Sequence, residues 1–146
     1  MVFRGTFPTK VDAQGRIKIP AAHRSVLEEY GSELYVTSVT GAHVLIYPMN
    51  EWEEIEARLM EPPRMLPEKI KFLRGTSFFG QTSNMDKQGR VLVQPHLRQA
   101  ASIEGEVAVM GYLNRLEVWN KERFQRILTE EPFTDADAAA LAHLGI

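Results

Sequence analysis

The chain has 146 residues, a length that fits a single domain. Hydrophobic residues make up 44% and charged residues 25%, which is ordinary for a globular protein. No apolar run of about 18 residues predicts a membrane span, and the start M-V-F-R-G lacks the hydrophobic stretch of a signal peptide. Because the chain has no cysteine, a disulfide framework and thiolate chemistry are excluded, and we expect a cytoplasmic protein.

The net charge of −2 argues by itself against a nucleic-acid binder, but the charges are unevenly distributed. Residues 1–26 hold five cationic side chains against the single acid Asp12, whereas residues 129–146 hold four acids and no Lys or Arg. The five N-terminal cations are Arg4, Lys10, Arg16, Lys18 and Arg24. Local patches of this kind matter more for binding than the sum of the charges.

The first elements read as a strand, a turn and a second strand. Phe7, Thr9 and Val11 alternate with Pro8 and Lys10, and the proline favours a strand at a sheet edge. Residues 12–15 then predict a turn, because Asp can bond the backbone ahead of it and Gly can adopt φ > 0. The alternation over 16–19 predicts a strand whose cations, Arg16 and Lys18, face outward.

Helical spacing follows, beginning at Pro20 and ending at Gly31. Residues 33–39 and 43–47 predict two further strands, and the apolar spacing within 50–59 predicts a second helix.

The same order then recurs. Residues 12–16 read D-A-Q-G-R and residues 86–90 read D-K-Q-G-R, and Arg24 returns as Arg98 at the same offset. The second copy predicts strands near 78–85 and 90–94, a helix from Pro95, strands near 106–111 and 115–119, and a helix at 121–128.

These elements divide the chain into two repeats, 5–59 and 77–128, joined by a proline-rich linker at 60–76. Each repeat is too short to bury much surface alone, so we expect the two to share one core. Short strands from two such units can interleave into a small closed barrel. Residues 129–146 form an acidic tail, with a final helix expected at 134–144 and Thr134 or Asp135 as its cap.

The duplicated turn is the candidate site. Asp12, Gly15, Asp86 and Gly89 shape the two turns, and each turn projects one arginine from its tip, Arg16 or Arg90. Arginine's planar fork suits phosphate oxygens and the edge of guanine, and a β-ribbon can enter a DNA groove. A single D-x-x-G is a common turn followed by a solvated arginine, but two copies in register favour a function.

Four motifs resemble the MraZ family: F-R-G at 3–5, D-x-x-G-R-I-x-I-P at 12–20, D-K-Q-G-R-V-L-V at 86–93 and L-E-V-W at 116–119. The resemblance covers the chain from Phe3 to about Leu128. It implies an α+β fold that is mainly β with short helices, a double swapped-hairpin (double-psi-like) β-barrel of the AbrB/MazE/SpoVT type.

The resemblance also implies a function: a ring-shaped homo-oligomer that binds short direct repeats in the promoter of the division and cell-wall gene cluster, typically as a repressor at the nucleoid. The family's DNA-contacting arginines fall on Arg16 and Arg90, and Lys18, Lys10 and Arg4 join them as candidate DNA contacts. Members often carry Lys before the motif glycine, where this chain has Gln14 and Gln88. Candidate ring contacts are the helices at 50–59 and 121–128 and the F-R-G start.

Three other classes of function explain fewer features of the sequence. No nucleophile elbow, phosphate loop or metal-ligand spacing is present, so we expect no enzyme, cofactor, metal site, small-molecule substrate or membrane partner. A ring-forming assembly protein would explain the repeats and apolar helices but not the outward cations. An antitoxin-like protein-binding module of the same fold usually has one hairpin unit and a long disordered tail.

Overall fold

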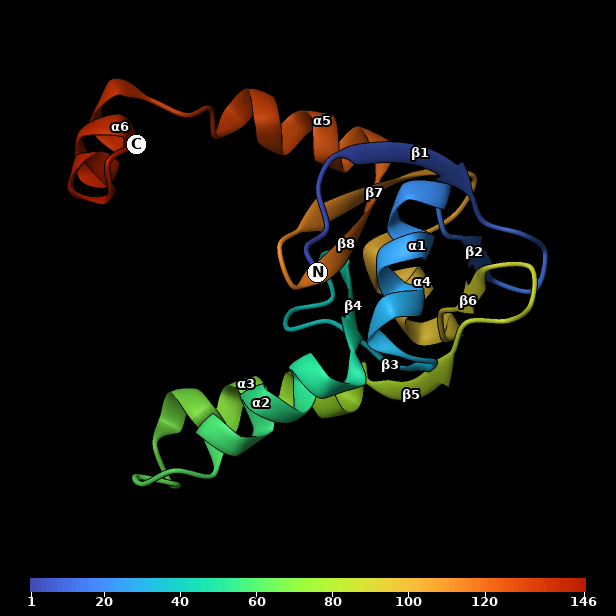
Figure 1. Cartoon of the computed structure of the whole chain (residues 1–146), viewed down its shortest axis with the longest axis horizontal. Helices are drawn as coiled ribbons and strands as arrows, with labels where there is room; N and C mark the ends of the chain where they lie inside the picture. The colour runs from blue at the N-terminus through green and yellow to red at the C-terminus, as the bar shows by residue number, and fades with distance from the viewer.

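Two antiparallel sheets form the centre of the molecule in the computed structural model, which describes residues 1–146 (Figure 1). The strands are β1 (Thr6–Lys10), β2 (Arg16–Lys18), β3 (Glu33–Thr37), β4 (Val44–Pro48), β5 (Gln81–Asn84), β6 (Arg90–Leu92), β7 (Glu106–Tyr112) and β8 (Arg115–Asn120). The helices are α1 (Ala21–Tyr30), α2 (Met49–Leu59), α3 (Pro67–Phe78), α4 (Pro95–Ala101), α5 (Lys121–Glu130) and α6 (Asp135–Leu141), and a 3₁₀ turn η1 (Ala142–Leu144) follows.

The two repeats exchange their first strands. The larger sheet has the order β1-β7-β8-β4-β3-β5, so β1 of the first repeat pairs with β7 of the second, and β5 of the second pairs with β3 of the first. The two-stranded sheet pairs β2 with β6, again one strand from each repeat. The interleaving expected of a swapped-hairpin unit is therefore present.

The predicted α+β class with an antiparallel sheet and short helices is confirmed, but the closed barrel is not. Strands β1 and β5 are the two free edges of the six-stranded sheet. Because β2 and β6 are only three residues long and pair with each other, they do not continue the ladder from one edge to the other. A single bridge between Val11 and Ile17 links the short sheet to the chain segment after β1.

One core cluster contains residues of both repeats. Helices α1 and α4 lie between the two sheets in Figure 1, and their residues Leu27 and Leu97 are fully buried. The same cluster contains Ile17 and Val91 from the short sheet and Val118 from the large one. Neither repeat could bury these residues without the other, since each sheet is completed by strands of both repeats.

Two helical arms leave the body on the side opposite the short sheet (Figure 1). Helices α2 and α3 lie side by side in one arm, where Trp52 stacks on Tyr35 at 4.6 Å and Phe72 at 6.2 Å between ring centroids. Helix α3 lies largely inside the segment 60–76 that we predicted as a linker, and Pro67 begins it at the first helical position, where its missing N–H costs nothing.

The second arm is α5 followed by α6. The predicted cap of the last helix is confirmed: the Thr134 hydroxyl accepts from the Asp137 N–H at 3.2 Å, and the Asp137 carboxylate accepts from the Thr134 N–H at 2.9 Å. No helix of the chain combines the length and apolarity that crossing a bilayer requires.

Candidate nucleic-acid interface

The short sheet is a two-stranded ribbon with one buried and one outward face. Its register sets Arg16 opposite Leu92, Ile17 opposite Val91 and Lys18 opposite Arg90. Ile17 and Val91 are fully buried, so alternation places the other four side chains on the outward face. Three of those four are cationic.

The ribbon is held by matching bonds on either side of a pseudo-twofold axis. The Ile19 N–H donates to the Gly89 carbonyl at 2.8 Å, and the Val93 N–H donates to the Gly15 carbonyl at 3.1 Å. The strand leaving each turn is thereby bonded to the turn of the other repeat. This arrangement brings Arg16 and Arg90 to one face.

The aspartate of each turn accepts two backbone hydrogen bonds within that turn. Oδ1 of Asp12 accepts from the N–H groups of Gln14 and Arg16, both at 2.9 Å. Asp86 repeats these bonds at the same distances. The turn glycines have φ of +84° at Gly15 and +76° at Gly89, a region that L side chains rarely adopt.

These hydrogen bonds make the turns sensitive to acid. The bond from the Arg16 N–H lowers the pKa of Asp12 below its ordinary 3.8, and the bond from the Arg90 N–H does the same for Asp86. Such a carboxylate contributes its full stabilisation of the turn at pH values above its ordinary pKa. That contribution is lost as the pH falls through the lowered pKa of the folded state.

We expect NMR titration of the two carboxyl groups to give midpoints below 3.8. The matched control is the double variant Asp12→Asn with Asp86→Asn, which keeps an oxygen acceptor but cannot titrate. Its free energy of unfolding should fall less between pH 5 and pH 2 than that of the unaltered chain. Equal losses in both proteins would contradict the role given to these carboxylates.

Two arginines outside the predicted set of site residues cover the turns. Arg98 of α4 lies over Gly15, where an added Cβ would overlap its guanidinium group, and Arg24 of α1 lies over Gly89, where a Cβ would stand 2.9 Å from the Arg24 Cδ. Arg24 also donates to the Lys87 carbonyl at 3.0 Å. Arg24 is therefore bonded to the turn of the other repeat, whereas Arg98 lies over its turn without a hydrogen bond. The recurrence of Arg24 as Arg98 at the motif's own offset was the signal available in the sequence.

The two motif arginines have different surroundings. Arg90 donates to Gln88 Oε1 at 2.8 Å and lies 3.4 Å from Asp12 Oδ2 and 3.5 Å from Asp86 Oδ2. The side chain of Arg16 makes no hydrogen bond or ion pair and is partly exposed. The duplicated sequence thus gives one guanidinium group within ion-pairing distance of both aspartates and one that makes no direct contact, although its charge also lowers the pKa of Asp12 and Asp86.

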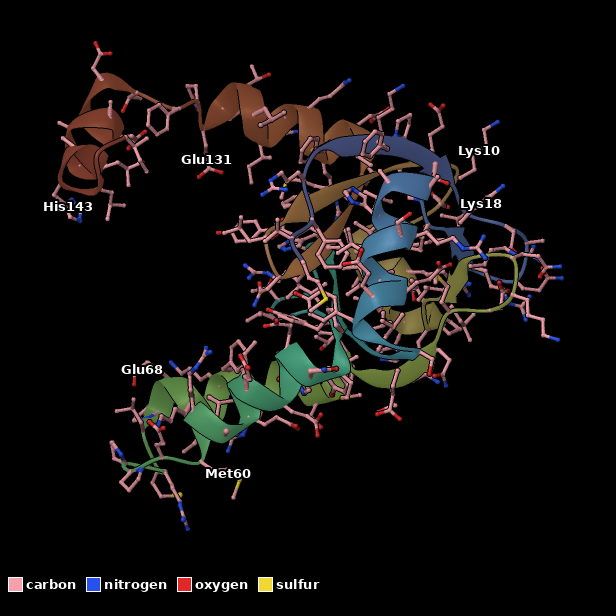
Figure 2. The ribbon with its side chains drawn as sticks, in the orientation of Figure 1. Lys10, Lys18, Met60, Glu68, Glu131 and His143 are labelled. Carbon is pink, nitrogen blue, oxygen red and sulfur yellow. The ribbon has the colours of Figure 1, made fainter.

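Of the other candidate cations, Lys10 and Lys18 lie close together, whereas Arg4 lies apart from them. The Thr9 hydroxyl donates to the Lys18 carbonyl at 2.8 Å, so Lys10 lies next to the ribbon, and both lysines extend outward on the same side in Figure 2. Arg4 lies at the far end of β1, where Phe3 bridges to Leu113 in the turn between β7 and β8. It is about 20 Å of extended chain away from Lys10 and does not join the ribbon.

The acidic tail is also remote from the ribbon. Helices α5 and α6 extend from the opposite side of the body in Figure 1, so the chain's own tail does not cover these cations.

Comparison with known proteins agrees with the duplicated architecture. A family model described as "MraZ protein, putative antitoxin-like" matches residues 2–75 and again residues 78–144. A protein named transcriptional regulator MraZ from Acidobacterium capsulatum is 44% identical over 146 residues, covering 99% of this chain and 100% of the relative. Proteins of the same name from Koribacter versatilis and Shewanella frigidimarina are 43% and 36% identical, covering 99% and 86% of this chain and 100% and 84% of the relatives. The chain belongs to the MraZ family.

Proposed function

We propose that the chain is a sequence-specific DNA-binding transcriptional regulator that places the β2–β6 ribbon against DNA. The observation that carries this proposal is the gathering of Arg16, Lys18 and Arg90 on the outward face of one ribbon, above a buried Ile17–Val91 pair. The names of its relatives support a role in transcription.

The dimensions of the ribbon suit a major groove. Paired strands lie about 4.8 Å apart, and the major groove is about 12 Å wide, enough for a two-stranded ribbon. Arg16 and Arg90 are diagonal neighbours in the register, with Cα atoms about 7–8 Å apart. Both guanidinium groups could therefore approach neighbouring bases or phosphates of one groove.

One ribbon offers few contacts, so assembly is part of the proposal. Small modules bind DNA non-specifically with Kd of about 10⁻⁴–10⁻⁶ M at physiological salt, and linked binding sites can gain about 10²–10⁴ in avidity. A ring of subunits on short direct repeats, in the promoter of the division and cell-wall gene cluster, would provide that gain. Exposed apolar side chains on the two arms support a self-association surface: Met60, Leu73, Leu128 and Phe133.

A role at promoter DNA also implies where in the cell the chain acts. A chain that binds promoter DNA in a bacterium works in the cytoplasm at the nucleoid, most simply as a repressor that blocks polymerase.

The alternative function is a ring-forming assembly protein, which the exposed apolar side chains of the two arms would equally serve. That alternative gives no reason for three cations on the ribbon's outward face.

The test is a gel-shift series with the DNA upstream of the chain's own gene, cut to contain one, two or three repeated boxes. We expect affinity to rise steeply with box number and to fall with added salt, with a slope of log K against log[salt] of about −0.9 for each phosphate contacted. A flat response to salt, or no dependence on box number, would rule out this mode of binding.

A further inference from the structure

The two ends of the ribbon carry different side chains, although the repeats place the same turn at each. Because β2 and β6 are antiparallel, Arg16 and Leu92 lie at the end next to turn 12–15, here called the first-turn end. Lys18 and Arg90 lie at the end next to turn 86–89, here called the second-turn end. Leu92 occupies in the second repeat the position that Lys18 has in the first, so the outward face is not symmetric in charge.

The guanidinium groups at the first-turn end are unpaired. Neither Arg16 nor Arg98, which covers Gly15, donates a side-chain hydrogen bond or forms an ion pair. Arg98 lines an open hollow of about 450 Å³ beside the turn. Asp12 and Glu104 line it too, but Asp12 is bonded to its own turn through Oδ1 and paired with Arg90 through Oδ2, and Glu104 is solvent-exposed. Two guanidinium groups without a hydrogen bond therefore lie at this end, Arg16 opposite the exposed Leu92 and Arg98 over Gly15.

The equivalent groups at the second-turn end are held by acids. Arg24 Nε lies 2.9 Å from Glu28 Oε1, and Arg90 is held as described above by two aspartates and an amide. The difference has a sequence origin, since Ser102 stands in the second repeat where Glu28 stands in the first. The cations left free at this end are Lys18 and Lys87, both exposed.

These two sets of side chains suit different parts of DNA. A free arginine fork pairs with the O6 and N7 atoms of guanine, and an apolar side chain can contact the methyl group of thymine. A lysine is a flexible point charge suited to phosphate, and phosphate contacts position a protein without reading sequence. Building on the proposed DNA-binding function, we propose that the first-turn end reads base edges through Arg16, Arg98 and Leu92, while the second-turn end holds the phosphate backbone through Lys18 and Lys87.

The test compares two variants by fluorescence anisotropy over a series of salt concentrations. One variant is Arg98→Gln and the other is the double variant Lys18→Gln with Lys87→Gln. The probes are a duplex from the region upstream of the chain's own gene and a scrambled duplex of equal length and composition. Arg98→Gln is expected to weaken the upstream duplex roughly tenfold to a hundredfold and the scrambled duplex little. The lysine variant is expected to weaken both equally and to reduce the salt slope by about 0.9 for each lysine.

A third variant supplies the matched control. Glu28→Gln removes the negative charge beside Arg24 at the second-turn end and leaves the bond from Arg24 to the Lys87 carbonyl in place, so it should strengthen both duplexes equally and steepen the salt slope. Thermal unfolding of every variant establishes that the fold is retained.

The inference is overturned if Arg98→Gln weakens both duplexes equally, if the lysine variant changes the ratio of the two affinities, or if the unaltered chain does not distinguish the duplexes. Absence of binding to either duplex by the unaltered chain would instead contradict the proposed function itself.

Discussion

Replacing Arg16 with alanine is expected to weaken promoter binding strongly while leaving the fold intact. The Arg16 side chain forms no hydrogen bond or ion pair, so its loss leaves no buried group without a partner. A guanidinium group that makes a bidentate base contact contributes about 1–3 kcal/mol to discrimination, so we expect Kd to rise roughly tenfold to a hundredfold. Anisotropy titration and a urea unfolding curve on the same preparation separate the two effects.

Arg90→Ala provides the comparison, because it removes the same side chain from the equivalent turn. Its guanidinium group is already held by Asp12, Asp86 and Gln88, and its loss leaves two carboxylates without their partner. We expect a smaller loss of affinity than for Arg16→Ala and a measurable loss of stability. Unchanged binding in Arg16→Ala would refute the role assigned to that arginine.

Replacing Ile17 with alanine is expected to have the largest effect on stability. Ile17 is fully buried, pairs with Val91 at the centre of the ribbon and belongs to the main core. Truncation of a buried isoleucine to alanine costs about 2–5 kcal/mol, against a total stability of about 5–15 kcal/mol for a typical domain. Because the ribbon is attached to the core through this pair, DNA binding should weaken together with stability.

Ile17→Val is the natural control, since valine is the residue that the second repeat uses at this position. It should cost only about 0.5–1.5 kcal/mol and leave DNA binding close to normal. Urea unfolding gives both values. If the alanine variant were as stable as the valine variant, the ribbon would not be anchored to the core as described.

The elements that could be predicted from the sequence are those whose formation depends on residues close together in the chain. The alternation at 16–19, the helix from Pro20 to Gly31 and the Asp-Gly turns are short-range patterns, and the structure contains each of them. The duplication added one long-range prediction, a core shared by two interleaved repeats, because neither copy is large enough alone.

The features that sequence did not predict depend on contacts between distant segments. The recurrence of Arg24 as Arg98 indicates a shared role, but the residues near them do not predict that each covers a turn in the other repeat, because that contact exists only after the repeats interlock. Helix α3 follows a proline-rich stretch that reads as a linker, and it packs on α2 through Phe72 and Trp52. Closure of the sheet likewise depends on strand length at β2 and β6, which the hydrophobic pattern does not fix within a residue or two.

The pairing of β1 with β7 and of β5 with β3 joins the two repeats of this one chain in the way that two subunits are joined in a dimer. Two separate halves would have to meet by diffusion, whereas the covalent connection gives each half a permanent partner at a high effective concentration, and folding becomes independent of dilution. In a dimer of identical chains every mutation is present in both halves, whereas in this chain a mutation in one repeat leaves the other repeat unchanged. The Lys18–Leu92 and Glu28–Ser102 differences are the kind of divergence that only such a fusion permits.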